Sequence, residues 1–485
     1  MNFKINRYSA PIVLLVMFGL MGTRCNKESE GTTPPPPVVE EALNVTCYLS
    51  SFDGSSKFSK QDVSFSKVEL NNNPTITIDT QTQFQEMDGF GYTLTGGSAI
   101  HLKNMSDSKR SALLYELFNH DDNNIGVSYL RISVGASDLD PEPFSYNDLA
   151  SGETDVNMEK FSLAPDKTAL IPVLKEILAI NPEIKILGSP WSPPTWMKTN
   201  NATKGGELLK EYYSAYALYF VKYVEGMAKE GITIDAITVQ NEPLHPGNNP
   251  SLYMPAEDQA EFVKNHLGPA FEAAGIGTKI IVYDHNADRP DYPITILNDP
   301  EAKKYIDGSA FHLYGGSIDN LSQVHNAHPD KNLYFTEQWI GAPGSFGNDM
   351  VWHINNLIIG ASRNWCKNVL EWNLAANSAL EPHTNGGCTE CLGALTIDGD
   401  NVVRNPAYYI IAHASKFARP GSMRVQSNQP GNLANVAFVA PNGSLVIVVV
   451  NNNDSNQTFN LEWGDQLISA SLAGKAVATY VWNQD

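Results

Sequence analysis

The feature that most constrains the fold is an alternation of short β-rich runs with longer amphipathic stretches between about residues 88 and 375. The β-rich runs are residues 89–94, 127–135, 184–190, 234–240, 279–284, 308–314, 332–338 and 369–375. Strands that alternate with helices imply parallel pairing through crossover connections. Eight such units predict the α/β class and a (β/α)8 TIM barrel.

One amphipathic stretch shows the helical period clearly. Residues 207–231 place Leu208, Tyr212, Ala215, Tyr219 and Tyr223 at steps of three and four before a terminal glycine. This spacing predicts a helix over 207–231. We expect its tyrosines to lie in the core.

The pattern changes after residue 404, where the predicted barrel of 87–404 ends. Residues 405–421 predict a last helix, and 434–453 predict a hairpin around Pro441-Asn442-Gly443. "TFNLEW" and "AVATYVWN" read as further strands. We therefore expect residues 405–485 to form the last helix and an appended β-sandwich. Residues 44–86, also rich in β-formers, are expected to contribute N-terminal strands to the sandwich.

The N-terminal region has the composition of a targeting segment. Lys4 and Arg7 precede the apolar run "APIVLLVMFGLMG", which has signal-peptide proportions and is too short for a typical membrane span. The following "TRCNKESE" resembles a bacterial lipoprotein signal, so residues 1–25 are predicted to be a signal peptide ending at a lipidated Cys25. Residues 26–43 form a proline-rich tether. These features predict an exported protein, an outer-membrane lipoprotein at the cell surface or in the periplasm; a free secreted protein is the alternative.

Charge and cysteine content restrict the partners and the chemistry. The net charge of −20 argues against nucleic acid as a partner, which requires a basic surface. Cys388 and Cys391 have a CxxC spacing, but a zinc site normally needs four ligands and the chain has no second CxxC. In an exported chain we favour a local disulfide or idle thiols over a metal site with His383. The pairing of Cys47 and Cys366 stays open, as does the oligomeric state.

Polar and aromatic side chains gather where the predicted strands end. In a TIM barrel the chemistry lies at the carboxyl ends of the strands. A purely structural barrel would not need so many such groups at equivalent positions. They are Arg131, Trp191, Asn241, Glu242, Asp284, His312, Tyr314, Glu337, Trp372 and Asn373.

Glu242 and Glu337 form the pair that suggests a reaction. Glu242 follows the apolar "AITVQ" and Glu337 follows "NLYF", at the predicted strands 4 and 7. Their separation of 95 residues corresponds to three βα units, so both should point into the same end of the barrel. Hydrolysis of a glycosidic bond with retention needs two carboxyl groups, one acid and one nucleophile. Spacing alone does not assign these roles. Asn241 could bind a sugar 2-hydroxyl.

A resemblance to a known family supports this interpretation. "GFGYTLTGGSA", "RISVGASDLD", "SPWSPPTWMKTN", "TVQNEP", "HLYGG", "FTEQW" and "EWNLAANS" resemble motifs of glycoside hydrolase family 30, over about residues 65–485. That family has a (β/α)8 barrel with a side β-sandwich built from both chain ends.

The resemblance also implies individual roles. It makes Glu242 the acid/base and Glu337 the nucleophile. It implies sugar contacts for Asp138, rather than Asp140, and for Trp191, Asn241, His312, Tyr314 and Trp372. Leu313 and "GYTLTGGSA" depart from the family pattern and leave the substrate open.

Four other residues near these motifs have simpler interpretations. His245 is expected to be a loop residue. Arg131 could equally pair with a carboxylate inside the barrel or contact sugar. Asp284 and His285 are weaker candidates to line the rim.

The sequence therefore predicts a retaining β-glycoside hydrolase that needs no cofactor or metal. The favoured function is an endo-β-1,6-glucanase acting by double displacement, although the sequence leaves endo or exo action open. The lipid anchor at Cys25 is the predicted membrane contact. Glucosylceramidase, β-glucosidase and β-xylosidase activities of the same family are alternatives. A non-catalytic surface glycan-binding protein is the alternative from another class, although it would not need both glutamates.

Overall fold

The computed structural model describes residues 42–483, and these form one compact unit. Residues 1–25, the predicted signal with Cys25, and nearly all of the predicted tether lie outside the described residues. None of the helices in the described part is long and apolar enough to cross a membrane.

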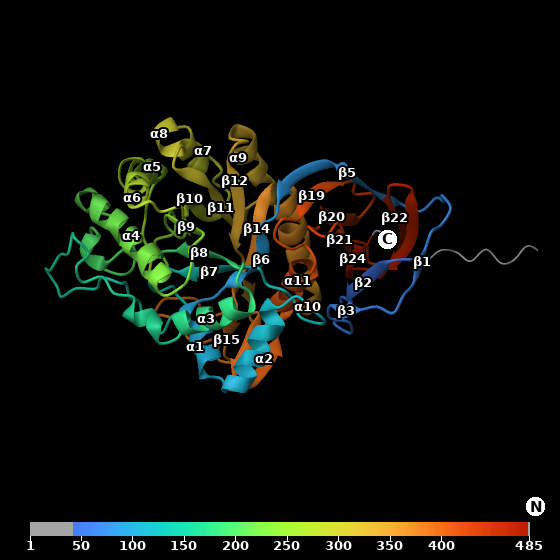
Figure 1. The fold of residues 1–485 in the computed structure, drawn as a ribbon, viewed down its shortest axis with the longest axis horizontal. Helices are drawn as coiled ribbons and strands as arrows, with labels where there is room; N and C mark the ends of the chain where they lie inside the picture. The colour runs from blue at the N-terminus through green and yellow to red at the C-terminus, as the bar shows by residue number, and fades with distance from the viewer. Residues whose placement is uncertain (1–41, 484–485) are drawn as a thin grey trace, which may run out of the picture. The chain divides into compact units, whose positions relative to one another are not determined.

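The central element is a closed barrel of eight parallel strands (Figure 1), which confirms the predicted fold class. Each predicted β-rich run corresponds to one barrel strand. In chain order the strands are β6 (Gly89–Thr93), β7 (Tyr129–Ser133), β8 (Lys185–Ser189), β9 (Ala236–Thr238), β10 (Lys279–Ala287), β11 (Ile306–Gly316), β12 (Asn332–Glu337) and β14 (Cys366–Asn373).

Helices cover the outside of the barrel, most of them between consecutive strands, and α11 follows the last strand. They are α1 (Gly96–Asn104), α2 (Asp107–Phe118), α3 (Leu170–Ile180), α4 (Tyr213–Lys229), α5 (Ala256–Phe262), α6 (Gly268–Ala274), α7 (Asp291–Leu297), α8 (Pro300–Lys303), α9 (Leu321–Ala327), α10 (Phe346–His353) and α11 (Pro406–Ser415). Their buried side chains join the strand residues in one large core.

The helix predicted over 207–231 begins later than expected. α4 starts at Tyr213, because Leu208 forms an antiparallel bridge with Lys198 and holds the preceding segment extended. Tyr219 and Tyr223 are fully buried in the core as predicted. The chain leaves the helix at Gly231, whose φ of +81° is a conformation that favours glycine.

The barrel interior is filled by a separate small cluster. Each strand except β6 contributes one buried side chain to it: Tyr129, Leu187, Ala236, Ile281, Ala310, Tyr334 and Leu370. The strand β6 instead brings Gly91 into register between Tyr129 and Leu370. The interior is therefore a packed core, and a ligand can enter only beyond the strand ends.

The appended domain is one hydrogen-bonded sheet of nine strands that packs on itself. Its strand order is β23-β22-β5-β19-β20-β21-β24-β2-β3. The strands are β2 (Val45–Ser50), β3 (Ser59–Lys60), β5 (Thr75–Glu86), β19 (Met423–Ser427), β20 (Leu433–Val439), β21 (Leu445–Asn451), β22 (Gln457–Trp463), β23 (Gln466–Leu472) and β24 (Val477–Trp482). Although β22 and β24 are not neighbours, Trp463 and Trp482 meet edge to face at 5.8 Å. One apolar core thus lies between the two halves of the sheet.

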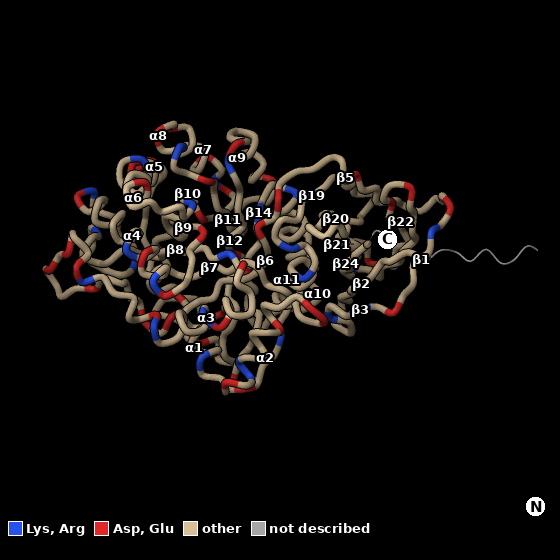
Figure 2. The backbone as a smooth tube through the Cα atoms, viewed as in Figure 1, with Lys and Arg blue, Asp and Glu red and all other residues tan. Residues whose placement is uncertain are grey.

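Both ends of the chain build this domain, as predicted. β2 pairs with β24, and β5 lies between β22 and β19. Figure 1 shows the N-terminal strands, in blue, beside the C-terminal strands, in red and orange. The predicted hairpin is β20–β21, whereas β19 and β23 were not anticipated from the sequence. Figure 2 shows acidic and basic residues spread over both domains.

The close approach at Gly91 predicts a stability effect. A Cβ atom there would lie 1.8 Å from the carbonyl oxygen of Tyr129, a backbone atom that cannot move without disturbing the barrel. We expect Gly91→Ala to reduce the free energy of unfolding by about 3 kcal/mol, at the upper end of overpacking costs. The measurement is chemical denaturation.

A matched control is Gly277→Ala, because nothing lies within 4 Å of the added Cβ there. Equal stability of the two variants would contradict the close approach in the barrel wall.

Candidate active site

A cavity of about 700 Å³ opens at the carboxyl ends of the barrel strands. This volume suits a small-molecule or sugar site. Most of the predicted site residues line it, and His312 does not. The lining residues are Asp138, Trp191, Asn241, Glu242, His245, Gly247, Asn248, His285, Asn286, Leu313, Tyr314, Glu337, Gln338, Trp339, Trp372, Gly386, Gly387, Cys388 and Cys391.

The two predicted carboxylates meet in this cavity. Glu337 is the last residue of β12, and Glu242 lies four residues beyond the end of β9. One carboxylate oxygen of each lies within 4.8 Å of the other. A retaining glycosidase holds its carboxyl groups about 5–5.5 Å apart, and an inverting one about 6.5–9.5 Å apart. The observed spacing is that of a retaining pair.

The backbone at Glu242 is held in an uncommon conformation. Its φ is +45°, in the left-handed region that non-glycine residues rarely adopt. Its N–H donates to the carbonyl of Asp284, and its own carbonyl accepts from the N–H of His245. Such strained residues occur where a side chain must be aimed. With this backbone conformation, the Glu242 side chain faces the cavity.

Glu337 accepts hydrogen bonds at both carboxylate oxygens. Arg131 donates to Oε2 at 2.6 Å, and the Tyr314 hydroxyl donates to Oε1 at 2.9 Å. Burial, the largest effect, raises the pKa of Glu337, and Glu242 adds to it, whereas His312 and Arg131 lower it; the net direction is upward. Both partners are donors that keep their protons, so the hydrogen bonds select the ionised form of Glu337.

Arg131 is fully buried beneath the cavity and does not line it. Besides Glu337, it donates to Asp284 Oδ2 at 2.9 Å and to Asn241 Oδ1 at 2.5 Å. The sequence left open whether Arg131 pairs with carboxylates or contacts sugar. The structure shows the pairing.

The carboxylate of Asp284 accepts hydrogen bonds from five side chains, and the residue is fully buried. Its φ is +65°, so this residue too lies in the left-handed region. Burial opposes its ionisation, but Arg131 and His312 hold its pKa far below the usual range. It was predicted to line the rim but lies below the cavity. The donors are Arg131, Ser189, Thr238, His312 and Thr336.

His312 lies behind the glutamates and has no exposed surface. Its Nε2 is 3.1 Å from Asp284 Oδ1, and its Nδ1 is 3.1 Å from Glu242 Oε1. Burial lowers the pKa of His312, but Glu337, Asp284 and Glu242 outweigh burial and raise it to about 9.

Glu242 and His312 are therefore coupled, and the directions of their pKa shifts favour a protonated His312 beside an ionised Glu242 at neutral pH. Burial raises the pKa of Glu242, but the hydrogen bond and charge of His312 bring the net pKa below the usual value. Because Asp284 is ionised, Nε2 of His312 donates to it. The remaining proton, between Nδ1 of His312 and Oε1 of Glu242, can be bonded to either atom. The contact gives Glu242 a direct path for proton exchange with His312.

Aromatic rings and one carboxylate form the rest of the wall. Trp191 and Trp372 have ring centroids 5.4 Å apart, and both line the cavity. Asp138 also lines it, whereas Asp140 turns away and accepts from the Ser137 N–H and hydroxyl. Burial and the charge of Glu337 raise the pKa of Asp138 to about 7.

Histidines and the disulfide complete the lining. His245 and His285 both face the cavity, and burial lowers the pKa of His285 to about 4. Cys388 and Cys391 form a disulfide, so their thiols are not free to bind a metal with His383. Cys47 and Cys366 are free and buried.

Comparison with known proteins places this geometry in a family. The model of the glycosyl hydrolase family 30 TIM-barrel domain matches residues 87–418, and that of the family 30 β-sandwich domain matches residues 421–480.

The chain belongs to glycosyl hydrolase family 30.

Named relatives of family 30 span most of the chain. The endo-1,6-beta-D-glucanase neg1 of Aspergillus fumigatus is 34% identical over 82% of this chain and 85% of its own. The endo-1,6-beta-D-glucanase of Neurospora crassa is 33% identical over 87% of this chain and 92% of its own. The lysosomal acid glucosylceramidase of Mus musculus is 27% identical over 98% of this chain and 96% of its own.

A solved structure, the endo-beta1,6-glucanase BT3312, has the same fold. It superposes with a TM-score of 0.84 at 36% identity, covering 91% of this chain and 99% of its own. Family 30 membership and the carboxylate pair together identify a glycoside hydrolase.

The sequence did not indicate the buried hydroxyl groups beneath the cavity that donate hydrogen bonds to Asp284. Ser189, Thr238 and Thr336 are ordinary strand residues by sequence, and their contacts with Asp284 depend on which way each strand faces. Trp339 and Asn286 also line the cavity without having been singled out. Trp339 lies within the motif "FTEQW", which was a usable signal.

The charge of Asp284 should control the proton on His312. Asp284→Asn keeps the side-chain size and removes a negative charge that raises the pKa of His312. We expect the pKa of His312 to fall from about 9 towards its ordinary value of 6.5. The ring would then lose its proton at lower pH, as measured by ¹⁵N NMR titration.

Asp140→Asn, a buried acid outside the cavity, serves as the control and should leave the titration of His312 unchanged. An unchanged titration in Asp284→Asn would contradict the coupling of Asp284 to His312 described above.

Proposed function

We propose that this chain is an endo-β-1,6-glucanase that cleaves with retention by double displacement. The single observation that carries the reaction type is the Glu242–Glu337 carboxylate pair within 4.8 Å. The substrate proposal rests on relatives named as endo-1,6-β-D-glucanases at 33–34% identity.

Glu337 acts as the nucleophile. Its two donors, Arg131 and Tyr314, orient the carboxylate and leave it ionised. Attack on the anomeric carbon forms a covalent glycosyl-enzyme and releases the leaving sugar. Charge moves off Glu337 as the bond forms.

Glu242 acts as the acid and then as the base. One of its oxygens faces His312 at 3.1 Å, and the other has no hydrogen-bond partner within residues 42–483. We assign the free oxygen to the leaving-group oxygen of the substrate. After departure, the same carboxylate removes a proton from the water that hydrolyses the intermediate.

The remaining predicted contacts position the sugar. Trp191 and Trp372 provide apolar ring faces, and Asp138 provides an acceptor for hydroxyl groups. Asn241 is oriented by Arg131, whose Nη2 donates to its Oδ1, so its amide N–H group is left to bind a sugar hydroxyl. We assign His312 to the proton supply of Glu242, because it lies behind the carboxylates and not against the cavity.

Substitution of each glutamate tests the mechanism. Glu337→Ala and Glu242→Ala should each lose turnover of β-glucan by about a thousandfold or more while substrate binding survives. Glu257→Ala, on the exposed face of α5, should retain activity. Variants of both glutamates that hydrolyse like the parent would refute the mechanism. A parent that binds β-glucan without hydrolysing it would favour the glycan-binding alternative.

The same variants assign the two roles when azide and an aryl β-glucoside are supplied. In Glu337→Ala, azide attacks the anomeric carbon from the side where the missing carboxylate would attack, and should give the α-glucosyl azide. In Glu242→Ala it attacks the glycosyl-enzyme and should give the β-glucosyl azide. The reverse stereochemistry would exchange the assignments.

A substrate panel tests specificity. We expect β-1,6-glucan to be cleaved internally, giving oligosaccharides released as the β-anomer, and we expect slower reaction of aryl β-glucoside, aryl β-xyloside and glucosylceramide. Chromatography of early products and NMR of the anomeric proton are the measurements. No action on β-1,6-glucan, with good activity on an aryl glucoside or xyloside, would overturn the proposed substrate.

We also propose that the enzyme is an exported lipoprotein attached through Cys25. The support is the sequence pattern of a basic start, an apolar run, "TRCNKESE" and a proline-rich tether. Mass spectrometry of the membrane fraction should find the mature chain beginning at an acylated Cys25, and Cys25→Ser should release the enzyme from membranes. A mature chain that begins elsewhere without acyl groups would contradict this.

A further inference from the structure

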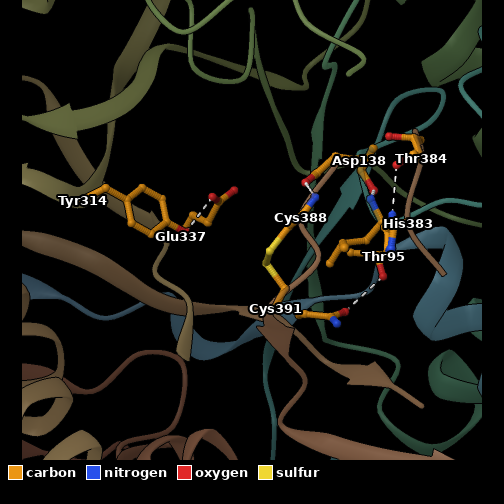
Figure 3. The surroundings of a disulfide bond; sticks show 11 residues. Thr95, Asp138, Tyr314, Glu337, His383, Thr384, Cys388 and Cys391 are labelled. Carbon is orange, nitrogen blue, oxygen red and sulfur yellow. Dashed lines mark hydrogen bonds between the residues drawn. A yellow bond between two sulfur atoms is a disulfide. The ribbon is translucent and has the colours of Figure 1, made fainter. Parts of the chain in front are cut away.

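The Cys388–Cys391 disulfide is part of the active-site wall. Both cysteines line the same cavity as Glu242 and Glu337. They pack in a small apolar cluster with Trp191, Trp372 and Leu139. Figure 3 shows the disulfide beside Asp138, with Glu337 and Tyr314 on another part of the cavity wall.

The segment before the disulfide closes on Asp138. The Cys388 N–H donates to Asp138 Oδ2 at 3.1 Å, and the Thr384 N–H donates to the Asp138 carbonyl at 2.9 Å. A Cβ at Gly387 would lie 2.4 Å from that carbonyl oxygen, so the backbone packs directly against it. Asp138 is thus held through both its main chain and its side chain.

The other end of the disulfide is attached to the segment that follows the nucleophile. Cys391 begins β16 (Cys391–Leu392), which pairs with β13 (Ile340–Gly341). The Ala342 N–H also donates to the Glu390 carbonyl at 2.8 Å. β13 begins three residues after Glu337. Residues 388–391 therefore connect Asp138 to the loop that leaves Glu337.

The orientation of Asp138 depends on this connection. Among the described residues, the Cys388 N–H is the one group of another residue that donates to its carboxylate. Its Oδ1 has no such donor and is available to a ligand. A disulfide across three residues removes little chain entropy from the unfolded state, so its main effect is on local order.

We propose that the Cys388–Cys391 disulfide is a positioning element for substrate binding. By closing the 388–391 loop it fixes the Cys388 N–H against Asp138 Oδ2 and aims Asp138 Oδ1 at a sugar hydroxyl. The inference rests on the proposed function, because it takes Asp138 as a sugar contact. The cysteines are positioning residues and take no part in bond cleavage.

The test combines removal of the disulfide with removal of the side chain it holds. Cys388→Ser/Cys391→Ser is made in the native chain and in Asp138→Ala, and aryl β-glucoside hydrolysis is measured for all four proteins. In the native background we expect KM to rise about tenfold with a smaller change in kcat. In the Asp138→Ala background the same double substitution should change kcat/KM less than about twofold, since its target is already absent.

Two further measurements separate positioning from folding. Melting temperatures of the four proteins should show the same stability change in both backgrounds, and Cys47→Ala controls for loss of a buried cysteine outside the cavity. Should the double variant not fold, dithiothreitol reduction of the folded native and Asp138→Ala proteins provides the comparison. The reagent is oxidised to its cyclic disulfide while Cys388 and Cys391 each gain a hydrogen.

The outcomes distinguish this inference from the function on which it rests. Equal losses of kcat/KM in the two backgrounds, or an unchanged KM in the native background, would overturn the positioning role alone. A parent chain that hydrolyses no β-glucoside would overturn the proposed function, and the inference with it.

Discussion

The buried guanidinium of Arg131 organises the site. Arg131 has no exposed surface, and a guanidinium in that position is strongly unfavourable unless carboxylates compensate it. Asp284 and Glu337 provide that compensation at 2.9 and 2.6 Å. The same charge favours the ionised form of Glu337, and the same guanidinium orients Asn241. One set of contacts around Arg131 therefore joins Asp284, Glu337 and Asn241, which come from three different parts of the barrel rim.

Local backbone strain accompanies this charge network. Glu242, Tyr283 and Asp284 have φ values of +45°, +73° and +65°. These residues lie where β9 ends and within β10, and the Glu242 N–H is joined to the Asp284 carbonyl. Conformations of this kind persist only when surrounding contacts outweigh their cost. The Glu242 side chain is consequently held towards the cavity before a ligand arrives, and a group positioned in advance needs less reorganisation.

Sequence periodicity predicts much of the architecture, because the barrel repeats one physical unit. Glu242 and Glu337 could be paired by spacing, since a whole number of βα units brings strand ends to the same face. The position of Asp284 could not be predicted in the same way, because an acid at a strand end has the same sequence pattern whether it faces the cavity or lies below it. The start of α4 was also hidden, because a bridge between Leu208 and Lys198 sets it. β19 and β23 were missed because their short, mixed sequences acquire strand character mainly from neighbours in the sheet.

The nine-stranded sheet has a consequence for the order in which the chain can fold. β2 and β5, near the start of the chain, find their partners in β24, β22 and β19, near its end. β5 is followed almost at once by β6, the first strand of the barrel. β2 and β5 therefore cannot pair until the C-terminal strands have been synthesised. Such long-range pairing is slow to form. This topology delays completion of the nine-stranded sheet until the C-terminal strands are available for pairing.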